Sequence, residues 1–243
     1  MTWTIKEICT NMCWGAYCTK GPRFGVTFNW DKADKTTKRR RRRSAGCAPN
    51  PNRCSTKKNY PKGHSCDEYP FASVKEADQG GQVNRCVPAD QNSRQGNLIG
   101  KYYQSSCGGN PCQFIVGFGN PNSAGVKYCS AFQDPKTMCV PDGNEFKGNN
   151  PDVQPPNKRD LDQVRGYLYM TERGTEVSFD HDLEPGTIIH SVRAINETLF
   201  DETLKLKRRD DYDYYDDSDN DDEDDVDDPN LEVVEDKIAY KIV

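Results

Sequence analysis

The sequence predicts an α+β fold: a small disulfide-tied domain, a short β-rich extension and an acidic disordered tail. All 11 cysteines lie between Cys9 and Cys139. Residues 1–159 hold 24 Lys and Arg against 12 Asp and Glu, whereas residues 160–243 hold 9 against 26. Only 34% of the residues are hydrophobic, so part of the chain is expected to lie outside a packed core.

The cysteine pattern indicates disulfides rather than zinc. Zinc modules favour repeated C-x2-C pairs, and this chain has none and only three histidines. Dense cysteines are typical of exported domains, and the odd number leaves one thiol without a partner in the chain. An extracellular location is therefore expected, although no signal peptide is visible after Met1. No apolar stretch is long enough to cross a membrane.

Turn-forming residues and charge divide the chain into four parts. These are a cysteine-rich domain, a linker, a β-rich extension of unknown role and an acidic tail, at residues 1–140, 141–160, 161–200 and 201–243.

Hydrophobic patterning predicts the elements of the first domain. Residues 24–30 alternate and form a candidate strand, and residues 72–78 a short helix that ends at Gly80-Gly81. Residues 113–118 are short and apolar, which favours a buried strand.

Three strands are predicted in the extension. Residues 166–171 and 176–179 flank an Arg-Gly turn, and residues 187–192 form the third strand. His181 and His190 in this region are interpreted as structural.

Residues 63–73 contain the densest polar cluster, with Asp67 and Glu68 adjacent. On a strand these side chains would point to opposite sides, so spacing alone does not make a catalytic pair. One carboxylate can hold Mg²⁺ or Mn²⁺ while the other orients an arginine or a water. The alternative is a surface turn before Pro70.

A second cluster at residues 85–96 mixes hydrogen-bond donors and acceptors with few apolar residues. Arginine, amide side chains and backbone N–H groups in such a loop can hold a phosphate. The alternative is a solvated loop pinned by its cysteine.

Together the clusters resemble the NucA/NucB-type deoxyribonuclease domain, most of all its cysteine-rich fungal branch. The first motif, D-E-W-P-M-A in the bacterial branch, matches here at Asp67, Glu68, Pro70 and Ala72. In place of the arginine that precedes the bacterial Asp-Glu, this chain has Cys66.

The second motif, N-R-G-A-G, matches at Asn92 and Gly96, and the basic segment before Ser44 also looks similar. The resemblance covers roughly residues 5–140. It implies a secreted, metal-dependent, non-specific endonuclease with a compact α+β core.

The resemblance also implies roles, because phosphodiester hydrolysis needs an activated water and positive charge at the phosphate. Asp67 or Glu68 would hold the divalent ion, and Asn92 and Gln95 would fix a water or a metal ligand. The candidate base is His64. The candidate phosphate-binding residues are Arg43, Arg85 and Arg94.

Two charge runs have competing interpretations. Lys38–Arg43 suits contact with the DNA backbone, protease processing or nuclear import. Residues 210–228 hold 13 Asp and Glu in 19 positions, which predicts either a solvating tail or a nucleic-acid mimic that restrains the enzyme. Cleavage at Lys207-Arg208-Arg209 would then release the tail.

The sequence thus predicts an extracellular DNase with DNA as its partner. Two alternatives stay open. One is a catalytically inactive secreted effector or binding protein on the same scaffold. The other is a nuclease that acts on RNA, since no contact to a 2′-hydroxyl can be located.

Overall fold

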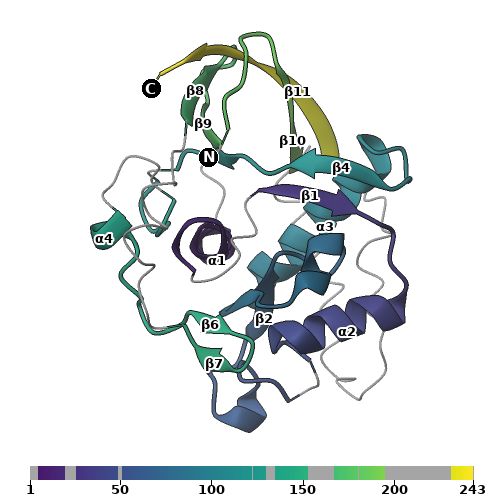
Figure 1. Cartoon of the computed structure of the whole chain (residues 1–243), viewed down its shortest axis with the longest axis vertical. Helices are drawn as coiled ribbons and strands as arrows, with labels where there is room; N and C mark the ends of the chain where they lie inside the picture. The colour runs from purple at the N-terminus through teal and green to yellow at the C-terminus, as the bar shows by residue number, and fades with distance from the viewer. Residues whose placement is uncertain are drawn as a thin grey trace.

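The computed structural model describes residues 5–19, 26–48, 51–121, 123–129, 135–152, 167–179, 181–194 and 231–242. Helices and strands are mixed, as predicted. The described residues up to 152 form a lower helix-and-sheet body, and a β-sheet built mainly from residues 167–194 and 231–242 lies above it (Figure 1). The helical segments are α1 (Lys6–Cys13), η1 (Trp14–Cys18), α2 (Lys35–Ala45), η2 (Thr56–Lys58), η3 (Lys75–Gln79), α3 (Ala89–Ser105) and α4 (Pro135–Met138). Among the described residues no helix is long and apolar enough to span a bilayer.

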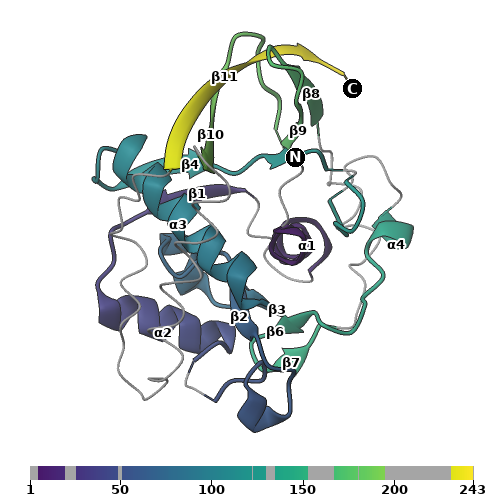
Figure 2. The ribbon, with the colours of Figure 1, turned by 180° about the vertical axis from the view of Figure 1, so that it is seen from behind.

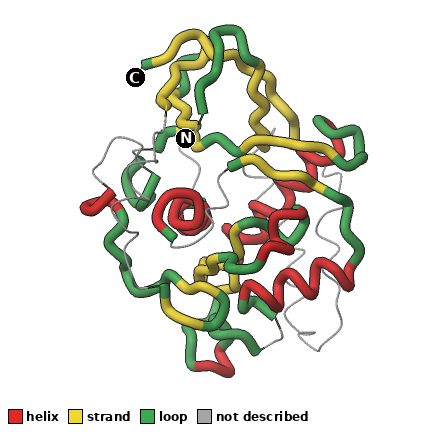
Figure 3. The backbone as a smooth tube through the Cα atoms, in the orientation of Figure 1, coloured by secondary structure: helices red, strands yellow, loops and turns green. Residues whose placement is uncertain are grey.

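The strands form three sheets, of two, four and five strands (Figure 3). In chain order they are β1 (Thr27–Trp30), β2 (His64–Tyr69), β3 (Val83–Pro88), β4 (Cys112–Ile115), β5 (Phe118–Gly119), β6 (Phe146–Lys147), β7 (Asn150–Pro151), β8 (Tyr167–Thr171), β9 (Glu176–Phe179), β10 (Ile188–Ala194) and β11 (Leu231–Lys241).

The centre of the lower body is the antiparallel pair β2–β3, followed directly by α3. Since neighbouring side chains on a strand alternate between the two faces, Asp67 and Arg85 share one face of this hairpin, and Glu68 and Asn84 share the other. Helices α1 and α3 pack on the Asp67 face, where Gln95 of α3 also contacts α1. Helix α2 lies on the Glu68 face.

The core compensates for a low hydrophobic content with aromatic rings and disulfides. The rings of Trp30 and Tyr103 stack 4.2 Å apart, which joins β1 to α3. Gly15 is needed where η1 meets β2, because a Cβ there would overlap the ring of Tyr69. The disulfides are Cys13–Cys129, Cys18–Cys139, Cys47–Cys66, Cys54–Cys86 and Cys107–Cys112. All 11 cysteines are described, and Cys9 is the free thiol that the odd number predicted.

Several predicted strands are confirmed: β1 and β8 lie within residues 24–30 and 166–171, and β9 spans the predicted residues 176–179. Strand β10, predicted at residues 187–192, begins one residue later and extends to residue 194. The segment at residues 113–118 divides into β4 and β5, and Ile115 is 44% exposed, so this is not a fully buried strand. The short helix predicted at residues 72–78 is the 3₁₀ segment η3.

Two helices lie where the sequence analysis predicted none. The arginine run forms α2, which Asp34 caps by accepting a 2.7 Å hydrogen bond from the Thr37 amide, and which ends at Gly46 with φ +86°. The second polar cluster, interpreted as a loop, belongs mainly to α3. Its glycine and polar residues hid the helical period.

The predicted linker at residues 141–160 is partly folded into the lower body. Asp142 and Glu145 bind the guanidinium of Arg85, each at 2.7 Å. Asp152 accepts hydrogen bonds from Trp14 Nε1 and Thr19 Oγ1, both at 2.9 Å. The proline and glycine content of this segment therefore shapes turns between short strands, and residues 153–160 lie outside the described residues.

The upper sheet has the strand order β10-β11-β8-β9-β5, so β5 of the lower body forms its edge. Figure 2 shows α3 running between this sheet and the β2–β3 hairpin. His190 of β10 joins the two parts through a 2.8 Å hydrogen bond between its Nδ1 and Ser106 Oγ.

The acidic tail predicted at residues 201–243 has a folded end, because β11 pairs with both β10 and β8. The β10–β11 pairing runs up to Ala194 opposite Leu231. Residues 195–230, which contain the acidic run, therefore connect two adjacent strands and lie outside the described residues.

Arg41 holds α2 on the body: its side chain is 1% exposed and bonds Asp31 and Asp78 at 2.6 and 2.9 Å. We expect Arg41→Ala to lower the free energy of unfolding by about 2–3 kcal/mol, because two partly desolvated carboxylates lose their cation. The matched control is Arg40→Ala, whose side chain is 62% exposed, with a loss of about 0.5 kcal/mol. Urea unfolding with intact disulfides measures both, and equal losses would contradict the anchoring role.

Candidate active site

The two adjacent acids of the first motif point to opposite faces of β2. Asp67 is 2% exposed and faces α1, whereas the side chain of Glu68 is 12% exposed and faces α2. Glu68 forms an ion pair with Arg42, whose Nε lies 3.6 Å from its carboxylate. The two carboxylates therefore do not converge on one ion.

Asp67 is a buried carboxyl with polar neighbours. Its Oδ2 accepts a 2.8 Å hydrogen bond from Asn11 Nδ2, which also donates to the Asp67 carbonyl at 3.1 Å. Burial raises the pKa of Asp67 well above its usual value and the charge of Glu68 adds to the rise, while the Asn11 bond and Arg85 oppose it. A carboxyl held in this way is a typical acid, base or metal-ligand candidate.

The second motif meets the first on this same face. Asn92 of α3 donates through Nδ2 to Ser65 Oγ at 3.0 Å and to the Cys66 carbonyl at 3.3 Å. Gln95, one helical turn further, donates to the sulfur of Met12 in α1 at 3.4 Å. The hairpin and the helix that follows it thus bring Asp67, Asn92 and Gln95 to one side of the sheet.

The donor set on this face suits a hard divalent cation. The Asp67 carboxylate, the Ser65 hydroxyl and the Asn92 amide carbonyl are oxygen donors, and the Asn92 amide turns its nitrogen toward β2. Among the described residues, no group of three or more His, Cys, Asp or Glu is arranged so that it could hold a metal ion by itself. One carboxylate fits the way proteins hold Mg²⁺ together with substrate phosphates.

His64 lies on the face opposite Asp67, since it alternates with Cys66 and Glu68 along β2. Its Nδ1 is 3.2 Å from the Pro61 carbonyl, and its ring packs against Tyr60. The candidate base is therefore separated from the Asp67 carboxyl by the strand itself.

The three candidate phosphate-binding arginines have different surroundings. The Arg85 guanidinium is shared by the carboxylates of Glu7, Asp142 and Glu145, each at 2.7 Å, so it already has more negative partners than one phosphate would supply. Arg94 is buried along α3, at 9% exposure. Arg43 is exposed near the C-terminal end of α2.

Sequence reasoning missed the contribution of α1. Asn11 binds Asp67, and Glu7, four residues earlier on the same helix face, binds Arg85. Cys9 lies in the same helix, and burial followed by the charge of Asp67 raises the pKa of its thiol to about 11. The i, i+4 spacing of Glu7 and Asn11 was visible, but nothing local linked Asn11 to Asp67, 56 residues further along the chain.

Comparison with protein-family models matches residues 12–116 to the family described as Deoxyribonuclease NucA/NucB. The matched region includes the whole β2–β3–α3 unit and is narrower than the resemblance suggested. The curated proteins and the solved structures gave no match to the chain. The enzyme class is that of a DNA-hydrolysing nuclease. The chain therefore contains a deoxyribonuclease domain of the NucA/NucB family.

Proposed function

We propose that this domain is an extracellular, metal-dependent endonuclease whose reacting site is the Asp67 face of the β2–β3–α3 unit. The observation that carries the proposal is the meeting of a carboxyl of raised pKa with Asn92 of α3 and Asn11 of α1. Asn11 of α1 binds this carboxyl directly, and Asn92 of α3 binds the neighbouring Ser65 hydroxyl and Cys66 carbonyl, so α1, β2 and α3 place polar groups around Asp67.

Each residue then has a distinct task. Asp67 and the Asn92 carbonyl are the groups that would hold the divalent ion, with Ser65 beside them. When bound, such an ion polarises the phosphate and lowers the pKa of the attacking water. Asn11 positions the Asp67 carboxyl through its 2.8 Å bond, and Gln95 keeps α3 against α1.

Substrate would approach over Ser65 and Asn92. These two residues are half-buried, whereas Asp67 itself is covered on the α1 side. Glu68 then acts on the other face as the partner of Arg42 and not as a second ligand.

Of the interpretations of Lys38–Arg43, the fold supports contact with DNA. Arg39, Arg40 and Arg43 are exposed on α2, while Arg41 is buried. A processing protease needs an extended segment, and α2 is a capped helix whose centre is fixed by two carboxylates. Exposed cations on a rigid helix suit the phosphate backbone and predict binding that weakens with salt.

Secretion is supported by the five disulfides, which persist in oxidising compartments. These bonds also join the N-terminal helices to residues 129 and 139, so the ends of the lower body are covalently fixed to each other.

We further propose that the acidic run restrains the enzyme by occupying its cationic surface. Because residues 195–230 connect β10 to β11, the run is tethered at both ends. A cut at residues 207–209 would open this connection without releasing it, since β11 stays paired with β8 and β10. Restraint would then be lifted by salt or by competing DNA.

Neighbouring substitutions test the reacting carboxyl. We expect Asp67→Asn to lower kcat for plasmid cleavage in Mg²⁺ or Mn²⁺ at least about 100-fold, because the amide cannot supply a negatively charged ligand. Glu68→Gln, one residue along the same strand, serves as the matched control and should lose less than about fivefold. An RNA arm and a chelator arm are run in parallel. Full activity of D67N, or a loss of activity with E68Q alone, would contradict the Asp67 face as the reacting site and place it on the Glu68 face.

A second test uses stability and needs no turnover. Since the folded-state pKa of Asp67 is raised, its contribution to stability is full below the unfolded pKa of about 4 and is lost as pH rises through the folded pKa. In chelator, D67N should therefore match the wild type near pH 4 and exceed its Tm near pH 7. Mg²⁺ or Mn²⁺ should raise the Tm of the wild type only. Parallel pH curves for the two proteins would contradict the raised pKa.

The acidic run is tested by charge at constant length. Replacing its 13 Asp and Glu with Asn and Gln should increase the rate of DNA cleavage at low salt, and the gain should vanish above about 0.5 M salt. Deleting residues 210–228 while keeping β11 should also increase the rate of DNA cleavage at low salt. Truncation after Leu206 is unsuitable because it removes β11. Equal low-salt rates for all three proteins would exclude restraint.

A further inference from the structure

Arg53 differs from the other arginines of the lower body in how its charge is compensated. Arg41 and Arg85 each face two or more carboxylates. Arg53 donates instead to the side-chain and backbone oxygens of Asn84 and Asn144, at 2.8–3.0 Å. All four acceptors are neutral, so its hydrogen bonds are satisfied while its charge is not.

This uncompensated charge is also poorly hydrated. Burial lowers the pKa of Arg53 to about 10, and the Phe146 ring lies 3.7 Å from its guanidinium carbon. In the part of the chain that the structure describes, no carboxylate pairs with it. Glu145 acts on it only at longer range and is itself bound to Arg85. A nearby anion would therefore be stabilised.

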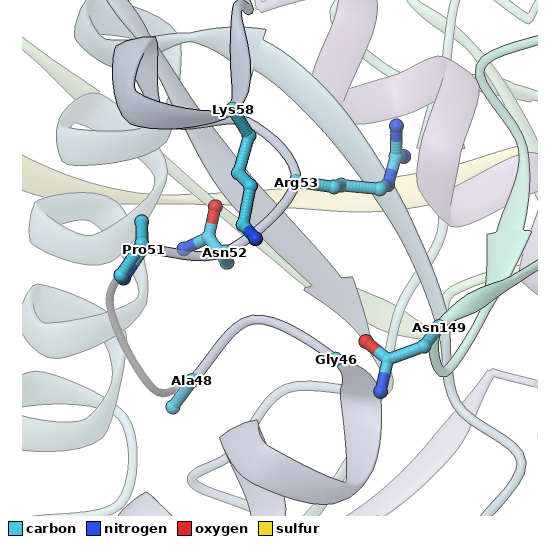
Figure 4. A pocket seen from close by; sticks show the side chains of 7 residues that line it. All are labelled: Gly46, Ala48, Pro51, Asn52, Arg53, Lys58 and Asn149. Carbon is cyan, nitrogen blue, oxygen red and sulfur yellow. The ribbon is translucent and has the colours of Figure 1, made fainter.

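A cavity of about 390 Å³ lies beside Arg53 (Figure 4). Its polar lining residues are Asn52, Arg53, Lys58 and Asn149, and no acid lines it in the part of the chain that the structure describes. Figure 4 shows the Lys58 ammonium directed toward the space between Asn52 and Asn149. Lys58 is exposed and has no ion-pair partner among the described residues. The cavity thus offers cationic and amide groups without a competing carboxylate.

Disulfides and hydrogen bonds hold the described residues of the cavity wall. Disulfides Cys47–Cys66 and Cys54–Cys86 tie its loop to β2 and β3. Asn52 closes the loop internally, donating to the Cys47 carbonyl at 2.7 Å and accepting from the Cys54 amide at 3.0 Å. Gly46 packs closely against the backbone of Gly148, because a Cβ at residue 46 would overlap the Gly148 carbonyl. A rigid site loses little entropy on binding.

We propose that this cavity binds a phosphate group of the DNA backbone at a nucleotide other than the one cleaved. The proposal rests on the proposed function, since it assumes DNA as substrate. Asn84 accepts a hydrogen bond from Arg53 and lies on the face of the β2–β3 hairpin opposite Asp67. One phosphate therefore cannot occupy both sites. Helix α2, which carries exposed arginines, ends beside the cavity at Gly46, so a DNA backbone that contacts these arginines could extend to the cavity. Free inorganic phosphate has the same chemistry and is separated from DNA by the test.

The experiment compares Lys58→Met with Lys57→Met, its neighbour in the same turn, which does not line the cavity. For long duplex DNA, K58M should raise KM about three- to tenfold with kcat unchanged. It should also reduce the slope of log affinity against log salt by about 0.9. K57M should change KM less than twofold. With bis(p-nitrophenyl) phosphate, which is too small to reach two sites, K58M and wild type should agree.

Binding of inorganic phosphate to the full chain, measured by calorimetry in chelator, provides a readout without turnover. Wild type and D67N should bind it equally, and K58M at least fivefold more weakly. Equal binding by K58M and wild type, or an equal KM effect on the small diester, would overturn the proposal. Phosphate binding that depends on Lys58 without any KM effect on DNA would assign the cavity to the free ion and overturn its role in DNA contact. An active D67N would instead refute the proposed reacting site.

Discussion

The clamp of α1 on the β2–β3 hairpin is the interaction on which the rest of the nuclease body depends. Asn11 and Glu7, one helical turn apart, bind Asp67 and Arg85, which are opposite each other in the β2–β3 register. One short helix thereby places an amide and a carboxylate over two strands at once. The charge of Arg85 is distributed over three acids, so it stays buried, while Asp67 receives only a neutral donor.

The chemistry of the two faces follows from this arrangement. Charge is neutralised around Arg85 and Arg41, whereas Asp67 on the α1 side and Arg53 on the α2 side have neutral hydrogen-bond partners among the described residues. Because a buried group without a counter-charge costs free energy, such groups are retained mainly where a ligand supplies the missing charge. The carboxyl suits a cation and the arginine suits an anion, as expected for an enzyme that acts on a polyanion.

The sequence predicted the parts of this architecture that depend on local pattern or residue chemistry. The number of cysteines predicted both a disulfide framework and one free thiol. The alternation of apolar residues on either side of Arg173-Gly174 predicted a hairpin, and Gly174 at its turn has φ +78°. The opposite directions of Asp67 and Glu68 followed from strand geometry. Helix α2 carried readable signals, an Asp N-cap and a glycine C-cap, but its six consecutive cations were interpreted only by function and no helix was predicted there.

The rest depended on contacts between distant segments, which no local pattern encodes. Asp142 and Asp152 fold a proline-rich segment onto the body because Arg85 and Trp14 bind them. Strand β11 was not predicted because it follows the 13 acids of residues 210–228 and was assigned to the same acidic tail. Its pairing with β8 and β10 shows that it belongs to the upper sheet. That pairing changes the regulatory argument. A free tail dissociates once it is cut, whereas a connection between paired strands keeps its local concentration, so the proposed restraint would be reversible by competition rather than ended by cleavage.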